Sequence, residues 1–402
     1  MNQNQQPSAI QFNYSALDSV RLGVPANRGL AEAVKSSDAT RVLLLGSSSL
    51  ASQTDNFAAI KHAVQATGKN VELQSFCKIR AHTPREDVLE AIALAADFGA
   101  DLLVSVGGGS VIDACKVVQL AVDQGLSSAA DLLEYAQGSD GTRGSLAGDM
   151  SVFQGQSKIR QIAIPTTLSG AEFSNNAGVL NTVKSTKEGY RGIDLCPKHI
   201  LYDPQLATLT PQWLWLSTAI RALDHAVEGY CSKDAHPFLQ GHFLHAMRLF
   251  AESLPITKAN PLDLHARSFN QQAVWLACVG LGDVSHGASH GIGYILGSLC
   301  GVPHGYTSCV MLPAVLEWNS KNCLQQQQPI SAALGYPEMS ASRAVKNLIS
   351  SLGLPTSLRE VGVDEAKLAE IAARAFIHPV VKKNPRTINA KEEVEEILQL
   401  AW

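Results

Sequence analysis

The first half of the chain alternates short β-rich runs with helical stretches, and this rhythm restricts the possible folds more than any other feature of the sequence. Runs typical of buried strands cover residues 41–45, 71–77, 101–106, 161–164 and 200–203. Apolar residues at helical spacing lie between the strands, at 58–65, at 84–98 and from Val111 onward. Strands that alternate with helices in this way predict a doubly wound, mostly parallel sheet with helices on both faces.

The second half has a different character, because helical windows follow one another from Pro211 onward. These windows cover residues 212–230, 239–253, 263–281, 341–351, 363–376 and 391–400. We therefore expect a domain boundary near Leu206, with an α/β domain at 1–205 and an all-helical domain at 206–402. A segment rich in glycine and serine, residues 138–156, is predicted to form a long loop or a hairpin.

Composition excludes several classes of protein. Of the 402 residues, 46% are hydrophobic and 17% are charged, which excludes a mainly disordered chain. The net charge of −4 gives no electrostatic reason to bind nucleic acid or an acidic membrane. No apolar run approaches the ~20 residues of a membrane span, and residues 1–9 lack the pattern of a signal peptide.

The eight cysteines are scattered and include no CxxC pair, which favours reduced thiols over disulfides. We therefore expect a cytoplasmic protein. Neither nucleic acid nor a membrane is an expected partner, and the sequence leaves a homodimer open.

A glycine tract stands where the predicted strand 101–106 meets its helix. It consists of Gly107, Gly108, Gly109 and Ser110. Glycines let the backbone approach a ligand closely, and the free N–H groups of the following helix attract a phosphate. The tract matches neither a Walker A loop nor G-x-G-x-x-G. It therefore indicates either a pyrophosphate site or a turn in which glycine serves geometry alone.

A second polar segment, PTTLSGAE at residues 165–172, follows another predicted strand. The hydroxyls of Thr166, Thr167 and Ser169 at the carboxyl end of a strand suit ribose, amide or phosphate contacts in the ligand crevice of an α/β sheet. An ordinary turn with a Ser or Thr helix cap has the same composition.

Four histidines are candidates for a metal site. His286 and His290 are four residues apart, a spacing that places both on one face of a helix. His304 follows in VPHG, and His225 lies within the helical window 212–230. Histidine is a common ligand of divalent metals, and separate helices can converge on one ion. For any single histidine of this set, a packing role in the core or at the surface is the alternative.

The ordered series of motifs resembles the iron-containing alcohol dehydrogenase superfamily, which includes the maleylacetate reductases. The matching segments are GGGSVIDACK at 107–116, PTTLSGAE at 165–172, DHAVEGY at 224–230, HGASHGIG at 286–293 and VPHG at 302–305. The resemblance implies a dinucleotide-binding α/β domain, an all-helical domain and catalysis in the cleft between them. Dehydroquinate synthase shares this architecture.

The resemblance also implies roles for individual residues. The pyrophosphate region of NAD(H) or NADP(H) would be held by Gly107, Gly108, Gly109, Ser110 and Asp113. Contacts to the nicotinamide side would come from Thr166, Thr167 and Ser169, and Lys187 would reach the ribose or the phosphates. The metal ligands of the family match His225, His286 and His304, and His290 matches a histidine that assists proton transfer to or from the alcohol oxygen.

One departure from the family pattern concerns the metal. Members that depend on a metal carry an Asp one helical turn before the first histidine ligand, and here that position is Arg221. A permanent cation beside neutral histidines repels a divalent ion. Asp224 directly precedes His225, and consecutive residues point about 100° apart around a helix. Asp224 is therefore a poor substitute ligand and is free to pair with Arg221. We therefore expect little bound iron or zinc.

Loss of that Asp also resembles the maleylacetate reductase branch, and so does the segment Asn384-Pro385-Arg386-Thr387. That branch usually has Asn at the position of Arg221, so the match is incomplete. We expect Arg221, with His225, His286 or His290 as proton donor, to act on the substrate; the alternative is an ion pair of Arg221 with Asp224 or Glu228. Arg386 is a weaker second candidate for binding an acidic substrate.

The cofactor preference is predicted from the strand 41–45, which leads into Ser47 and two further serines. NAD-preferring relatives often carry there an Asp that binds the ribose hydroxyls and repels a 2′-phosphate. Its absence predicts that NADPH is accepted at least as well as NADH, unless the serines only cap the next helix.

The sequence thus predicts an NAD(P)-dependent oxidoreductase that interconverts a small carbonyl compound and its alcohol. A maleylacetate-type reductase is the first alternative. A dehydroquinate synthase-like lyase and a degenerate binding protein with a disabled site are more remote alternatives.

Overall fold

The computed structural model describes residues 10–53, 55–67, 70–138, 142–149 and 157–402. Residues 1–9 and parts of the predicted loop, 139–141 and 150–156, lie outside the described residues. No helix in the described part of the chain is both long enough and apolar enough to cross a membrane.

The centre of the amino-terminal half is a six-stranded sheet in which every neighbouring pair of strands is parallel. The strand order across the sheet is β1-β9-β6-β4-β2-β3. The strands are β1 (Ser19–Leu22), β2 (Arg41–Gly46), β3 (Glu72–Phe76), β4 (Leu102–Gly107), β6 (Arg160–Pro165) and β9 (His199–Tyr202). The predicted parallel α/β fold is confirmed, and β1 is a strand that the sequence analysis did not predict.

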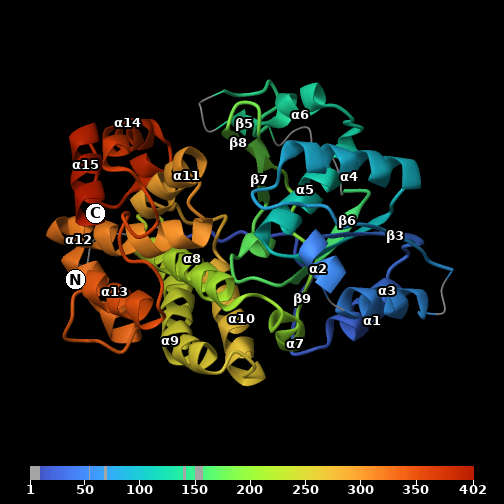
Figure 1. The fold of residues 1–402 in the computed structure, drawn as a ribbon, viewed down its shortest axis with the longest axis horizontal. Coiled ribbons are helices and arrows are strands. Elements are labelled where there is room, and N and C mark those ends of the chain that lie inside the picture. The colour runs from blue at the N-terminus through green and yellow to red at the C-terminus, as the bar shows by residue number, and fades with distance from the viewer. Residues whose placement is uncertain (1–9, 54, 68–69, 139–141, 150–156) are drawn as a thin grey trace.

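Helices cover both faces of this sheet (Figure 1). Side chains alternate along β2, so Val42 and Leu44 pack with α1 and α3, whereas Leu43 and Leu45 pack with α4 and α5. The amino-terminal helices are α1 (Ala26–Ser36), α2 (Ser48–Gln53), α3 (Asp55–Gln65), α4 (Arg85–Phe98), α5 (Gly109–Gln124), α6 (Ala129–Tyr135) and α7 (Pro204–Ala207).

A small antiparallel sheet packs beside α5 and was not predicted. It consists of β5 (Gln137–Gly138), β7 (Asn176–Asn181) and β8 (Thr186–Arg191), in the order β5-β8-β7. Ala177 and Val179 of β7 join the apolar cluster of α4 and α5, and Lys187 extends from β8. This sheet therefore brings a lysine of the amino-terminal half toward the helical half.

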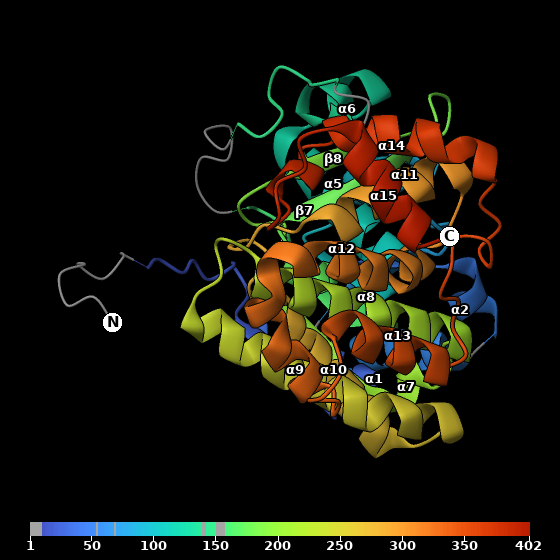
Figure 2. The same cartoon turned by 90° about the vertical axis from the view of Figure 1, so that its left-hand side faces the viewer.

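The carboxyl-terminal half is all-helical, as expected, and lies to the left of the sheet in Figure 1 and toward the viewer in Figure 2. Its helices are α8 (Gln212–Cys231), α9 (Pro237–Ala259), α10 (Leu264–Cys278), α11 (Ala288–Cys300), α12 (His304–Ala333), α13 (Ala341–Ser351), α14 (Leu368–Ile377) and α15 (Lys391–Leu400). The central helix α8 is buried along most of its length and packs against α9, α10 and α12. The domain boundary near Leu206 stays a prediction.

Helix α12 was missed by the sequence analysis, and its sequence explains why. It contains Pro313 and Pro329, and the backbone at Cys323 leaves the helical region at φ −126°. Proline inside a helical pattern usually marks an end, yet here the chain continues across a kink.

Candidate active site

The sheet has its topological switch point between β2 and β4. The chain passes from β2 outward to β3 and then returns to place β4 on the other side of β2. Gly46 at the end of β2 pairs in register with Val106 of β4, and Gly107 pairs with Pro165 of β6. Ligands of open α/β sheets bind outside the carboxyl ends of the strands at such a point. The serines, the glycine tract and the PTTLSG loop all begin at this edge.

The glycine tract and the PTTLSG loop lie against each other. The Thr166 N–H donates to the Gly107 carbonyl oxygen at 2.9 Å. A Cβ on Gly108 would lie 2.9 Å from Thr167 Cγ2, and one on Gly109 would lie 2.9 Å from Ser169 Oγ. The amino-terminal end of α5 receives no side-chain cap from Gly108, so its first N–H groups remain for a ligand.

Three other predicted cofactor residues have structural partners. The Ser47 hydroxyl accepts a long hydrogen bond of 3.4 Å from the Leu50 N–H at the start of α2. The Ser110 hydroxyl accepts from the His82 N–H at 3.0 Å. The Asp113 carboxylate accepts from the Gly178 N–H at 3.0 Å and so ties α5 to β7.

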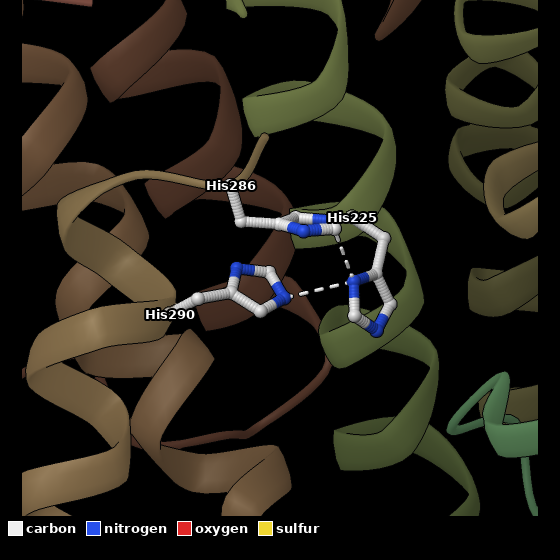
Figure 3. Close-up of side chains that lie close together, drawn as sticks. All are labelled: His225, His286 and His290. Carbon is white, nitrogen blue, oxygen red and sulfur yellow. Dashed lines mark hydrogen bonds between the residues drawn. The ribbon is translucent and has the colours of Figure 1, made fainter. Parts of the chain in front are cut away.

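Three histidines meet at one atom, Nδ1 of His225 (Figure 3). It lies 2.8 Å from Nε2 of His290 and 3.0 Å from Nε2 of His286. The expectation that His286 and His290 share a helical face is wrong, because α11 begins at Ala288 and His286 lies in the loop before it. The loop at Gly287 nevertheless turns the ring of His286 back onto that of His290, with the ring centres 4.3 Å apart.

His290 is anchored by two acidic residues of α8, Asp224 and Glu228, for which the sequence analysis assigned no such role. Its Nδ1 lies 2.8 Å from Glu228 Oε2 and 3.5 Å from Asp224 Oδ2. Burial, together with the nearby Asp224 charge, raises the pKa of Glu228 to about 8, although backbone N–H groups at the start of α11 oppose the shift. Two acids inside an otherwise apolar helix are the signal that could have revealed this contact.

His304 lies apart from this cluster. Its Nε2 is 3.3 Å from Lys187 Nζ, and it is not among the histidines whose nitrogen atoms converge, which are His225, His286 and His290. The charge of Lys187, followed by burial and the charge of Arg221, holds the pKa of His304 well below its usual range. The structure therefore places Lys187 against a predicted metal ligand, and its contact with the ribose or the phosphates stays a prediction.

Arg221 acts on both the histidine cluster and His304, because its charge lowers the pKa of each of these histidines. It is 7% exposed, and its Nη1 donates to Ser308 Oγ at 3.2 Å and lies 4.0 Å from Asp224 Oδ2. Its guanidinium sits over the Tyr294 ring, with Cζ 5.5 Å from the ring centre. Burial and the Arg221 charge lower the pKa of His286 to about 3.

The second arginine candidate, Arg386, stands elsewhere. It donates to the Trp318 carbonyl oxygen at 2.6 Å, and its guanidinium lies 3.3 Å from the centre of the Trp318 ring. These contacts give Arg386 a packing role in the helical half.

The PTTLSG loop, residues 165–170, lies against the histidine cluster. A Cβ on Gly170 would lie 2.3 Å from Cys278 Sγ and 3.9 Å from Cδ2 of His225. The backbone of Ser169 also acts on His225 and raises its pKa against the larger lowering effect of burial. The PTTLSG loop therefore joins the switch point of the sheet to the histidines.

Comparisons with known proteins agree with this arrangement. The Iron-containing alcohol dehydrogenase family matches residues 19–204, and the Fe-containing alcohol dehydrogenase family, C-terminal, matches residues 215–402. A dehydrogenase of Alternaria alternata is 31% identical over 90% of this chain and 98% of its own. The chain belongs to the iron-containing alcohol dehydrogenase family. It is an oxidoreductase of the alcohol dehydrogenase type.

Two further relatives of this iron-containing alcohol dehydrogenase family member carry different names. A maleylacetate reductase of Sphingobium indicum is 27% identical over 89% of this chain and 90% of its own. The solved structure of the iron-containing alcohol dehydrogenase of Thermococcus thioreducens is 25% identical, covers 97% of this chain and 99% of its own, and has a TM-score of 0.84. Both branches considered in the sequence analysis are therefore represented among its relatives.

Proposed function

We propose that the protein transfers a hydride between NAD(P)H and a small carbonyl compound and thereby interconverts the carbonyl with its alcohol. The observation that carries this proposal is the contact of Ser169 and Gly170 with His225. It places polar groups suited to proton transfer and charge stabilisation beside the loop that begins at the ligand edge of the sheet.

The residues at this edge fit a dinucleotide. The closely packed Gly108 and Gly109 leave no room for side chains, and the open end of α5 offers N–H groups to the pyrophosphate. The hydroxyls of Thr166, Thr167 and Ser169 would hold the nicotinamide side. Ser47, Ser110 and Asp113 would contribute from the same edge, although each has a structural partner as well.

The residues of the histidine cluster do not fit a divalent metal. Arg221 occupies the position at which metal-dependent members of the family carry a carboxylate ligand. Its positive charge lowers the pKa of all four histidines. His304, a ligand in the family, instead faces the ammonium of Lys187 at 3.3 Å. Two cations bordering four neutral imidazoles disfavour a further dication. We therefore propose a reaction that does not require iron or zinc.

The side chains of this cluster can perform the remaining chemistry. Bound NAD(P)H supplies the hydride. Negative charge then develops on the carbonyl oxygen, where the N–H groups of Arg221 can stabilise it. His225 can donate a proton to that oxygen while it takes one from His290, and the contact of His290 with Glu228 provides the replacement.

A screen of NADH and NADPH oxidation with aldehydes, ketones and oxo-acids tests this function. We expect turnover with at least one class of carbonyl compound. In Gly108→Val we expect a raised KM for the nucleotide, because the new side chain would clash with Thr167. Gly189→Ala is the control, because its Cβ would make only an ordinary contact at 3.5 Å. No oxidation with any carbonyl, combined with no nucleotide binding by fluorescence, would favour the degenerate binding protein.

A maleylacetate-type reductase is the second candidate. It is favoured by the replacement of the carboxylate ligand by Arg221 and by the maleylacetate reductases among the relatives. Inclusion of an unsaturated oxo-dicarboxylate in the same screen tests it directly.

A further inference from the structure

The segment that joins β3 to α4, residues 77–84, crosses the ligand edge of the sheet. The Ile79 N–H donates to the carbonyl oxygen of Gly46, at the end of β2, at 3.3 Å. Three residues later, the His82 N–H donates to Ser110 Oγ, at the start of α5, at 3.0 Å. The segment therefore runs from β3 past the switch point to the glycine tract, where the nucleotide is expected.

Two consecutive residues of this segment adopt a backbone conformation that is unusual for their side chains. His82 has a φ of 65° and Thr83 has a φ of 58°. Glycine is the usual residue in this left-handed region, and a β-branched residue is a genuine outlier there. Strain of this kind persists only where surrounding contacts impose it, and it clusters at ligand sites. The presence of a histidine at residue 82 therefore calls for a functional reason.

The contacts that impose this conformation come from three elements. The Thr83 hydroxyl donates to the Ser110 carbonyl oxygen of α5 at 3.1 Å, and the Thr83 carbonyl oxygen accepts from the Leu180 N–H of β7 at 2.9 Å. An ion pair of 2.6 Å joins Arg80 to Asp87 of α4. The backbone on both sides of the histidine is therefore held in place.

The ring of His82 lies edge-on against the ring of His304, with 5.6 Å between ring centres and 70° between planes. Burial, followed by the charge of Lys187, lowers the pKa of His82. The residue is half-buried, and in the described part of the chain neither ring nitrogen has a hydrogen bond. His82 therefore contacts the start of α5 through its backbone and His304 through its ring, and both ring nitrogens are available to a ligand.

We infer that the ring of His82 binds the ribose on the nicotinamide side of NAD(P)H. This inference rests on the proposed function. The pyrophosphate is expected at the start of α5, and the reacting carbonyl at the histidines. The nicotinamide-side ribose is the part of the dinucleotide that joins these two places. An imidazole offers one donor and one acceptor nitrogen, which suits the two neighbouring hydroxyls of a ribose.

The test compares two fragments of the nucleotide by calorimetry. ADP-ribose carries the nicotinamide-side ribose, whereas ADP ends at the pyrophosphate. In His82→Gly we expect the Kd of ADP-ribose to rise by about 2–12-fold, as for the loss of one or two hydrogen bonds, and that of ADP to change by less than about twofold. His82→Asn should recover part of the affinity, because Asn has a donor and an acceptor and tolerates the left-handed region.

The choice of glycine separates binding from folding. Glycine adopts a φ of 65° without strain, so the midpoint of urea unfolding of His82→Gly should stay the same or rise. Ser185→Gly is the matched control. Ser185 has a φ of 52° in the exposed turn between β7 and β8, and this variant should leave the affinity for both fragments unchanged.

Equal losses for ADP and ADP-ribose in His82→Gly, or no loss for ADP-ribose, would overturn the role of His82 and leave the proposed reaction intact. If the wild type binds neither fragment and oxidises neither NADH nor NADPH with any carbonyl compound, the proposed function itself is overturned.

Discussion

Arg221 and Asp224 lie one helical turn apart on α8, with Nη1 4.0 Å from Oδ2. The separation is at the limit of an ion pair, and the same carboxylate oxygen is already held by two serine hydroxyls. Burial raises the pKa of Asp224 to about 6, against the opposing effect of the Arg221 charge. The pair therefore holds Arg221 in place without neutralising it fully, and this balance underlies the predictions for the histidine cluster.

Removal of metal should leave the activity intact. Exhaustive chelation of the wild type is expected to preserve NAD(P)H oxidation, because Arg221 and Lys187 disfavour a dication, and elemental analysis should find substoichiometric iron and zinc. Arg221→Asp restores a carboxylate at the ligand position and should raise the metal content. Stoichiometric metal held through His225, His286 and His304, and lost together with activity, would contradict the expectation.

NADPH should be accepted at least as well as NADH. Ser47 follows β2 at the switch point and offers a hydroxyl where an acidic residue would repel the 2′-phosphate. Ser47→Asp should change the ratio of kcat/KM values toward NADH by about tenfold, equivalent to about 1.4 kcal/mol. The ratio is measured by initial rates with both nucleotides, and a strong NADH preference of the wild type would refute the idea.

A methyl group at residue 178 should displace Lys187. In Gly178→Ala the new Cβ would lie 2.2 Å from Lys187 Cε, so the flexible end of the lysine must shift, and its 3.3 Å contact with His304 must change. Stability should change by less than about 1 kcal/mol, whereas kcat/KM for the carbonyl substrate should fall about tenfold or more, because Lys187 borders the proposed active site at His304. Urea unfolding and initial rates separate the two effects, with Gly189→Ala as the control. Unchanged kcat/KM in Gly178→Ala would show that the position of Lys187 does not matter for the reaction.

The free energy of unfolding should depend on pH through the titration of Glu172. This carboxyl is buried beside the Tyr202 hydroxyl, which donates to it, and burial raises its pKa from 4.5 to about 7. Between these values the folded state holds a proton that the unfolded state releases, so the contribution to stability is complete below pH 4.5 and is lost as the pH rises through 7. The slope is at most about 1.4 kcal/mol per pH unit.

Glu172→Gln removes this titration while retaining an acceptor for Tyr202. From pH 5 to pH 8 the free energy of unfolding of the variant should therefore rise relative to the wild type by up to about 3 kcal/mol. Urea unfolding at several pH values measures the difference, in which the titration of the other groups cancels. A difference that is independent of pH would show that Glu172 is already ionised when the protein is folded.

Local patterns predicted much of the fold. Helices α13 and α15 have the predicted bounds, because each combines a clear amphipathic period with polar flanks. The short strand β1 lacks such a signal, since its four residues are all half-buried and its place depends on pairing with β9, far along the chain. The small sheet was missed for a related reason. Its strands β5 and β8 lie far apart in the sequence and pair only in the folded protein.

The candidate site could be predicted as a set of residues but not as a geometry. Motif order led to His225, His286 and His290, yet the contact of Lys187 with His304 joins residues 117 positions apart. The position of His286 outside α11 also has a non-local cause. Glu228 accepts the N–H groups of Gly287 and Ser289, and Asn384 Oδ1 accepts that of Ala288, so the helix start is fixed by partners from other elements.

The close packing of Gly170 against Cys278, which leaves no room for a Cβ, limits how this enzyme can be re-engineered. A nucleotide-binding half taken from a relative with any side chain at residue 170 would collide with the sulfur atom of α10 and crowd His225. The two halves are thus not interchangeable modules. A chimera that alters cofactor specificity must carry the partners of the PTTLSG loop with it, and directed evolution of either half will be constrained by the other at this contact.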